Sequence, residues 1–230
     1  NSVLFNYLNY IGMNAFTYPI FRYQYGYDSV EGSGSSGMYP YGAGQLRSLL
    51  DTFAAHGKKF YGVFNPLGVP QIKLANLTDN DYVKQGMVLR DRYGNVVWSG
   101  RNMAANPCHP GVQKMLFDNY RNLLANYANH PGLGGLCVTD GTLAWISLDY
   151  GYGDFTVGKF SRDTGIAVPP DTAERYAFLT GAKRKEWLEW RARQITQNVA
   201  NYRKLVDEYN PGLKLHMMIS LSPDNYEKRG

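Results

Sequence analysis

The chain has 230 residues, of which 44% are hydrophobic and 19% are charged, which is enough apolar material for one sizeable core. This composition excludes a disordered tail, a collagen-like fibre and a disulfide-dense mini-protein, and no apolar run approaches the roughly 20 residues that span a bilayer. The net charge of +5, from 24 basic and 19 acidic residues, is too mild to indicate a nucleic-acid partner.

Four segments carry the apolar spacing of amphipathic helices, and each ends at a turn signal. They are predicted over Ser2 to Ile11, Gly44 to Ala55, Pro110 to Tyr127 and Ala182 to Tyr209. A short run of apolar and aromatic residues follows each helix after a tight turn, as in parallel strands covered on both faces. These strands are predicted over Asn14 to Ile20, Lys59 to Asn65, Gly134 to Asp140 and Leu213 to Leu221. Four repeats of helix, turn and strand predict a parallel α/β protein.

The long connections all follow strands, at Phe21 to Ala43, Pro66 to His109 and Gly141 to Gly181. In (β/α)8 barrels and in open doubly wound sheets, the carboxyl ends of the strands hold the ligand, so this distribution favours a functional edge. Inside the loops we expect a hairpin around Asp91 to Asn95 and a short helix over Phe155 to Asp163, capped by Asp154 and closed by Gly165.

Asp140 is the strongest candidate for catalysis, because it ends a predicted strand and Gly141 follows it. Burial can raise the pKa of such a carboxyl for acid work, or neighbours can keep it ionised as a base or nucleophile. The alternative is an Asp that caps a helix or braces a loop. Substrate binding is predicted for polar and aromatic residues of the same strand ends and loops: Asn14, Tyr18, Asn65, Trp145, Asp149, Tyr152 and Asp154. A structural role is equally open for Asn14, Tyr18 and Asn65.

Other reactive residues give weaker signals. His109 adjoins the start of the third helix, where a capping role is favoured over catalysis, and Cys108 and Cys137 could pair although no spacing demands it. The histidines have no metal-ligand spacing, and neither a serine-hydrolase elbow nor a phosphate-cradling glycine loop occurs, so no metal and no cofactor are predicted.

Charged and aromatic side chains also cluster locally. The basic residues of the last helix alternate with Glu186 and Glu189, which predicts a solvated helix face instead of a nucleic-acid patch; they are Lys183, Arg184, Lys185, Arg191 and Arg193. Six tyrosines crowd a Gly-rich stretch without helical or strand period, which suits sugar binding; they are Tyr18, Tyr23, Tyr25, Tyr27, Tyr39 and Tyr41.

Four short motifs spread over most of the chain resemble segments of TIM-barrel glycoside hydrolases. They are LNYIGMNA at 8–15, NPCHPGV at 106–112, NHPGLGG at 129–135, and YGDF at 152–155 with Phe160 and TGI at 164–166. The resemblance is to family 42 β-galactosidases, to family 10 and to uncharacterised glycosyl-hydrolase-like proteins. It implies a (β/α)8 TIM-type barrel, of which about four β/α units with long loops are present, and one catalytic-type domain over 1–230 that is truncated at both ends.

The resemblance also implies a carbohydrate substrate, hydrolysis of O-glycosidic bonds and no membrane partner. It makes Leu136 to Asp140 the fourth barrel strand, which ends in Asn-Glu in the large retaining clan but in Thr139-Asp140 here. Asp140 would then be a shorter acid or a nucleophile as in α-amylase-like barrels, or hydrolysis has been lost and the chain is a non-catalytic carbohydrate-binding relative.

The second carboxylate that such hydrolysis needs comes from the seventh strand, so it would lie beyond Gly230, and missing parts of the same polypeptide would complete the barrel. An unrelated α/β enzyme, such as a phosphate-ester or aldol-type barrel, is a third interpretation. The cellular location stays open, with a secreted or periplasmic one favoured.

Overall fold

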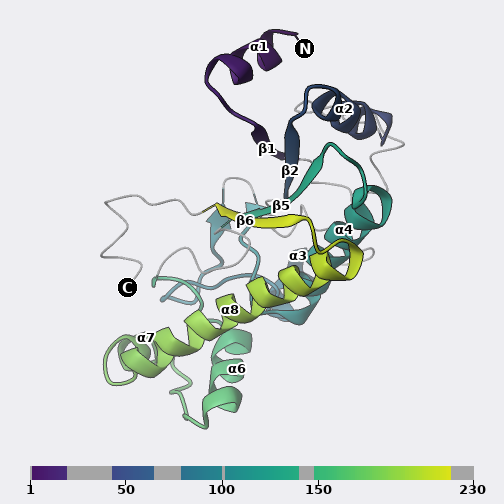
Figure 1. The fold of residues 1–230 in the computed structure, drawn as a ribbon. Helices are drawn as coiled ribbons and strands as arrows, with labels where there is room; N and C mark the ends of the chain where they lie inside the picture. Colours follow the sequence, from purple (N-terminus) through teal and green to yellow (C-terminus); the bar gives the residue numbers. More distant parts are fainter. Residues whose placement is uncertain (1, 20–42, 65–78, 100–101, 140–147, 219–230) are drawn as a thin grey trace. The chain divides into compact units, whose positions relative to one another are not determined.

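The computed structural model describes residues 2–19, 43–64, 79–99, 102–139 and 148–218, and Figure 1 shows their helices and strands. The chain forms two compact units. Unit 1 comprises Asn1–Asn65, Phe117–Thr139 and Tyr202–Met218, and unit 2 comprises Pro66–Leu116, Asp140–Asn201 and Ile219–Gly230. A single domain over 1–230 therefore stays a prediction. None of the described helices is both long and apolar enough to cross a membrane.

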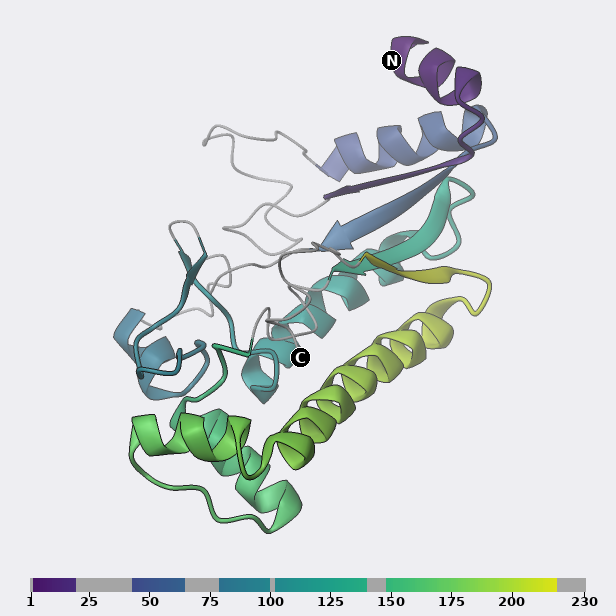
Figure 2. The ribbon, with the colours of Figure 1, turned by 90° about the vertical axis from the view of Figure 1, so that its left-hand side faces the viewer.

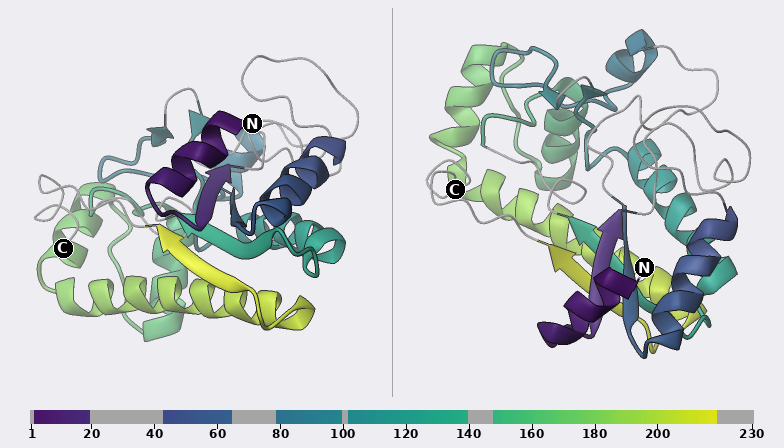
Figure 3. Two further views of the ribbon diagram at one scale, coloured as in Figure 1. Left: turned by 45° about the horizontal axis from the view of Figure 1, so that its top comes forward. Right: turned by 90° about the horizontal axis from the view of Figure 1, so that it is seen from above.

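Unit 1 contains a four-stranded sheet made of β1 (Ala15–Pro19), β2 (Lys59–Phe64), β5 (Leu133–Thr139) and β6 (Lys214–Met218). The strands lie in the order β1-β2-β5-β6, and all three pairings are parallel. Figure 2 shows the arrowheads of β1, β2 and β6 pointing the same way, and Figure 3 shows β6 at one border of the sheet. The predicted parallel α/β sheet is therefore confirmed, with β5 as an inner strand and β1 and β6 as its edges.

The four predicted helices are present, with bounds close to the expected ones. They are α1 (Ser2–Tyr10), α2 (Ala43–Ala55), α4 (Pro110–Tyr127) and α8 (Arg184–Tyr209). Pro110 opens α4 as predicted, since its missing N–H and fixed φ suit a first helical position.

Aromatic packing joins α2 to one face of the sheet. The Phe53 ring lies 5.5 Å from the Phe60 ring of β2 and 6.1 Å from the Phe16 ring of β1, measured between ring centroids. On its other side Phe53 meets Phe5 of α1 at 5.1 Å. Phe53 is fully buried, and burying a side chain of this size contributes roughly 1.5–3 kcal/mol. The helix stripe that predicted α2 is thus the face that covers the sheet.

The opposite face of the sheet is shaped by two glycines of β5. Tyr61 of β2 stacks on His216 of β6, with ring centroids 4.1 Å apart and planes 15° apart, although β5 lies between these strands. A Cβ atom on Gly134 would lie 2.7 Å from the Tyr61 ring. Gly135 has a φ of +149°, and a Cβ there would lie 1.9 Å from the Lys214 carbonyl oxygen. The Gly-Gly pair therefore lets two rings meet across an inner strand.

Unit 2 is built from the long loops together with parts of α4 and α8. It adds the elements α3 (Asp79–Lys84), β3 (Trp98–Ser99), β4 (Asn102–Met103), α6 (Asp154–Thr164) and α7 (Thr172–Thr180). The predicted hairpin is confirmed, because Arg90 bridges Val96, the Asp91 N–H donates to the Asn95 carbonyl, and Gly94 has a φ of +84°. The helices α3 and α7 were not predicted.

The start of α6 corrects one capping prediction. Gly153 is the N-cap residue and makes no side-chain cap, whereas Asp154 lies in the first helical turn. A carboxylate there is still favourable, because it faces the positive end of the helix dipole. At the other end Gly165 closes α6 with a φ of +74°, as predicted.

The core of unit 2 is an aromatic cluster on α6 and α8. Trp187 and Trp190 stack with centroids 5.2 Å apart, and Phe160 meets each ring edge-on. The Trp190 indole N–H donates to the Asp163 carboxylate at 2.8 Å. Each buried ring thus packs against another ring of the cluster.

The solvated-face prediction for the basic residues of α8 is wrong for Arg191. Lys183 pairs with Glu186 at 2.9 Å on the surface, but Arg191 is only 6% exposed. Its guanidinium donates to the Tyr150 carbonyl at 3.3 Å and lies 5.6 Å from the Trp187 ring centroid. Burial lowers the pKa of Arg191 to about 10, so it remains charged at neutral pH.

Gly135→Ala is expected to destabilise unit 1, because the added methyl group would collide with the Lys214 carbonyl at a backbone conformation unfavourable for alanine. We expect a loss of about 2–4 kcal/mol in the free energy of unfolding, measured by urea titration with far-UV circular dichroism. The control is Gly158→Ala inside α6, where the Cβ would lie 3.4 Å from the mobile Arg162 side chain. This control should be neutral or stabilise by up to about 1 kcal/mol. Equal stability of both variants would contradict the assignment.

Candidate active site

The candidate site is the edge of the unit 1 sheet at which the strands end. Register pairs Pro19 with Val63, Phe64 with Val138, and Thr139 with Met218, so neighbouring strands end within one residue of one another. The next residues in the chain are Ile20, Asn65, Asp140 and Ile219. In parallel α/β folds this is the edge that holds ligands.

Asp140 itself lies outside the described residues, but the strand that leads to it is well defined. All seven residues of β5 are buried, and Thr139 is 4% exposed. On both sides β5 is paired, through Val138 to Phe64 and through Thr139 to Met218. Position 140 therefore follows a buried strand that is paired on both sides.

Four further predicted residues have no described side chain or lie at the other edge. Asn65 and Trp145 fall outside the described residues, and Tyr18 lies in β1 with its side chain outside the description. Asn14 precedes β1 at the amino end, is exposed, and accepts the Lys59 N–H through its backbone carbonyl at 3.0 Å. This position gives Asn14 a backbone role beside β2, so we leave it out of the proposed site.

Asp149 belongs to a surface cluster in unit 2. Its carboxylate lies 3.4 Å from the Arg92 guanidinium, and the two side chains are 43% and 40% exposed. The same guanidinium lies over the Tyr93 ring at 4.8 Å and over the Tyr176 ring at 5.5 Å. An ion pair this exposed contributes about 0–1 kcal/mol, so the cluster presents polar and aromatic groups to solvent more than it stabilises the fold.

Asp154 pairs with Arg175, whose other contacts are structural. The Arg175 guanidinium lies 2.9 Å from the Asp154 carboxylate and donates to the carbonyls of Tyr152 at 2.8 Å and Pro170 at 2.9 Å. Arg175 is 8% exposed, and its donors join the segment before α6 to the loop between α6 and α7. The Asp154 side chain is 94% exposed, so its carboxylate adds little to this arrangement.

Tyr152 lies in the core of unit 2 instead of on a binding surface. It is fully buried, its ring meets Tyr176 and Trp187 at 5.1 and 5.9 Å, and its hydroxyl donates to the Leu148 carbonyl. Burial raises the pKa of this phenol, so the hydroxyl stays protonated. The structure thus gives Tyr152 a packing role and no open face for a sugar.

Both cysteines are free and buried, Cys137 in unit 1 and Cys108 in unit 2. Burial raises the pKa of Cys108 to about 11, so this thiol is unreactive at neutral pH. Among the described residues no three His, Cys, Asp or Glu side chains lie close enough together to hold a metal ion. The expected absence of metal and cofactor stays a prediction.

His109 caps α4, as the sequence favoured. Its carbonyl accepts the Gln113 N–H at 3.0 Å, and its Nδ1 accepts the Gly111 N–H at 3.1 Å. The ring is half-buried and lies 4.4 Å from the Phe155 ring. Because Nδ1 accepts a backbone hydrogen bond, the neutral ring fits this site better than the charged one.

Comparisons with solved structures place this fold among glycoside hydrolases. The β-galactosidase from the psychrophilic Marinomonas ef1 matches with a TM-score of 0.60 at 12% identity, over 94% of this chain and 34% of that one. The PgaB (BpsB) glycoside hydrolase domain from Bordetella bronchiseptica matches with a TM-score of 0.60 at 14% identity, over 94% and 58%. A GH42 β-galactosidase from G. stearothermophilus matches with a TM-score of 0.57 at 13% identity, over 94% and 33%.

The chain thus has the fold of part of an α/β barrel of the glycoside-hydrolase type, and it spans about a third to three fifths of the length of these structures. The fold and the resemblance to TIM-barrel glycoside hydrolases are confirmed. No protein-family description and no curated protein sequence matches the chain.

The free energy of unfolding is expected to decrease as the pH is lowered, because His109 becomes protonated. Burial lowers the pKa of His109 below its ordinary value of 6.5, so the unfolded chain takes up a proton before the folded one. The stabilisation that neutral His109 provides is complete above pH 6.5. It is lost as the pH falls toward the pKa of His109 in the folded protein. We expect wild type to lose more stability than His109→Asn between about pH 7.5 and 5, measured by urea unfolding. Asn can cap a helix without titrating. Parallel pH curves for the two proteins would contradict this assignment.

Proposed function

We propose that the chain forms the substrate-binding half of a glycoside hydrolase that cleaves O-glycosidic bonds of a carbohydrate, with Asp140 as acid/base or nucleophile. The observation that carries the proposal is the position of Asp140 directly after β5, a buried strand paired on both sides. The fold shared with glycoside hydrolases supports the reaction class.

The register suggests which group accompanies Asp140. Phe64 is the last residue of β2 and pairs with Val138, and Asn65 is the next residue in the sequence. A side-chain amide just after this strand end would hydrogen-bond sugar hydroxyls, as a donor and as an acceptor. We assign Asn65 a substrate-orienting role and Asp140 the chemical step.

Three further residues are proposed to contact sugars, each on its own evidence. Within unit 2, Asp149 forms an exposed pair of opposite charges with Arg92, whose oxygen and nitrogen atoms suit sugar hydroxyls. Trp145 lies in the loop between β5 and this pair, and Tyr18 lies near the end of β1. Both would offer flat aromatic faces for sugar rings.

Hydrolysis tests the role of Asp140. In the full-length protein we expect Asp140→Asn to lower kcat on chromogenic glycosides by about 10²–10⁴-fold, because the amide neither donates an acidic proton nor acts as a base. The matched control is Asp149→Asn, which should raise KM more than it lowers kcat, since Asp149 is assigned to binding. Equal hydrolysis by wild type and Asp140→Asn would remove Asp140 from the reaction.

The pair Thr139-Asp140 favours a second candidate, a non-catalytic carbohydrate-binding relative, because the resembling clan has Asn-Glu at this strand end. The side chain of Asp is one methylene shorter than that of Glu, so its carboxylate reaches less far from the strand. Sugar binding without turnover, by wild type and Asp140→Asn alike, would identify this second function.

We further propose that other β/α units of the same polypeptide complete the barrel beside β6 and over α1. Among the residues that the structure describes, β6 pairs only with β5, and its Met217 and Met218 are 44% and 48% exposed. On α1, Val3 and Tyr10 are 80% and 88% exposed. Further strand and helix neighbours would bury these apolar groups, and ordinary glycoside hydrolysis requires a second carboxylate about 5–9.5 Å from the first.

Hydrogen exchange tests this completion. Alternate amides of a parallel edge strand point away from its single partner, so some β6 amides should exchange quickly in residues 1–230 alone. In a longer polypeptide carrying the flanking units, we expect at least about tenfold slower exchange at Lys214–Met218. The inner strand Leu133–Thr139 should change little. Equal exchange of β6 in both proteins would refute the completion.

A further inference from the structure

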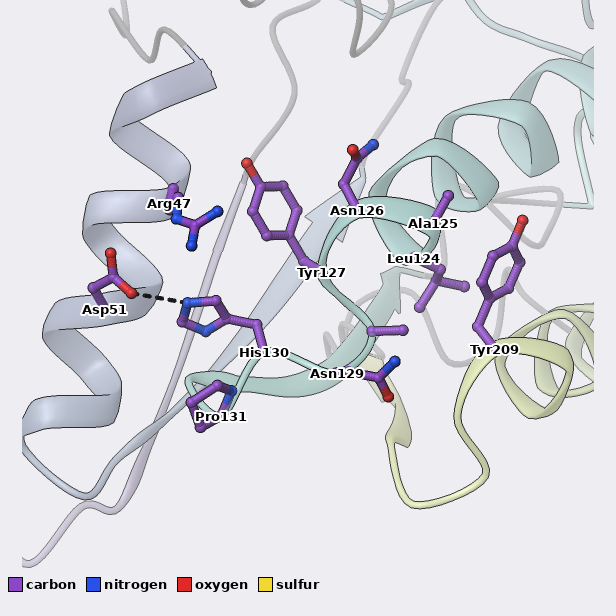
Figure 4. Close-up of a pocket in the computed structure, with 11 residues that line it drawn as sticks. Arg47, Asp51, Leu124, Ala125, Asn126, Tyr127, Asn129, His130, Pro131 and Tyr209 are labelled. Atoms are coloured by element: carbon purple, nitrogen blue, oxygen red, sulfur yellow. Dashed lines mark hydrogen bonds and ion pairs between the residues drawn. The ribbon is translucent and has the colours of Figure 1, made fainter.

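Unit 1 has a pocket at the sheet edge opposite the strand ends. It lies between α2 and the turn at residues 128–132 that joins α4 to β5, and its volume is about 450 Å³. Figure 4 shows α2 with Arg47 and Asp51 on one wall, and Tyr127 and His130 on the facing wall. The turn leads into the amino end of β5, so this pocket is separate from the edge that precedes Asp140.

An imidazole joins the two walls. His130 Nε2 lies 3.0 Å from the Asp51 carboxylate, and His130 Nδ1 accepts the Gly132 N–H at 3.1 Å. Because Nδ1 accepts the Gly132 N–H, the ring proton is on Nε2, and this N–H donates a hydrogen bond to the Asp51 carboxylate. A Cβ on Gly132 would lie 2.0 Å from the Leu50 carbonyl oxygen, so the turn packs directly on the α2 backbone. The pocket is therefore preformed.

The lining has the chemistry of a site for a neutral polar ligand. Arg47 and Asp51 carry opposite charges on the same wall, which disfavours a strongly anionic or cationic ligand. Asn126 and Asn129 add amide groups, of which Asn126 Nδ2 already donates to the Asn122 carbonyl at 2.8 Å and Asn129 Oδ1 accepts from Asn210 at 3.4 Å. The Tyr127 ring is half-buried and meets His130 edge-on at 6.3 Å. Aromatic rings beside donors and acceptors are the groups that sugar rings contact.

We propose that this pocket is a second carbohydrate-binding site, separate from the catalytic edge, which takes a neutral sugar ring. That the ligand is a carbohydrate rests on the proposed function. The location of the site rests on the pocket itself. A volume of about 450 Å³ lies within the roughly 300–1,000 Å³ of small-molecule sites. With the site at the amino ends of the strands, a carbohydrate chain held there is anchored without occupying the cleavage edge.

Binding is tested by ¹⁵N NMR titration of the full chain carrying Asp140→Asn, with lactose, maltotriose and inorganic phosphate as separate probes. We expect a sugar to shift the amides of Arg47 and of residues 124–131, and phosphate to leave them unchanged. Tyr127→Ala should raise the sugar Kd at least about tenfold, and so should the exposed Arg47→Ala, which is not expected to affect folding. Trp98→Ala, at an exposed aromatic residue of unit 2 that no proposed sugar contact uses, is the matched control and should leave Kd unchanged.

The outcomes separate this inference from the proposed function. Sugar shifts confined to the amides around Thr139 would refute the second site and leave the catalytic proposal standing. Chemical-shift changes at residues 124–131 that sugar still causes in both Tyr127→Ala and Arg47→Ala would refute the site as described. Changes that only phosphate causes would refute it as well. Binding at 124–131 together with full hydrolysis by Asp140→Asn would support the second site and refute the catalytic assignment.

Discussion

The parallel pairing of β5 with β2 on one side and β6 on the other is the interaction on which unit 1 depends. It aligns the ends of β2 and β5, with Phe64 opposite Val138, and these ends precede Asn65 and Asp140 in the sequence. The same pairing requires Gly135, because any side chain there would meet the backbone of β6. A sheet whose inner strand tolerates so little change holds the ends of β2, β5 and β6 in a fixed register.

The helices and strands of the sheet were predictable because each carries its own local signal. An apolar stripe marks α8, Pro110 marks the start of α4, and Gly165 marks the end of α6. The helix α7 was missed because it lies in a loop and owes its start to an Asp171 cap that accepts two N–H groups. Arg191 was misplaced because a charged residue is buried only where partners exist, and the carbonyl that accepts its hydrogen bond belongs to Tyr150, outside the helix.

The sequence could predict that the candidate site lies where the strands of the sheet end, but not which side chains contact one another there. Strand ends follow from periodicity, whereas the partner of Asp149 is Arg92 in a different loop, and no local pattern connects them. The burial of Tyr152 likewise depends on Tyr176 and Trp187, which come from α7 and α8. The pocket beside His130 was missed for the same reason, since α2 and the turn before β5 are far apart in the sequence.

The distribution of tryptophan has a spectroscopic consequence. All four tryptophans of the chain, at positions 98, 145, 187 and 190, belong to unit 2, and unit 1 contains none. Excitation of indole therefore reports the unfolding of the loop-built unit, with the stacked Trp187 and Trp190 as its buried reporters. Far-UV circular dichroism also detects the sheet and its helices. Different midpoints for the two signals would reveal that the units unfold separately, and a common midpoint would reveal one cooperative transition.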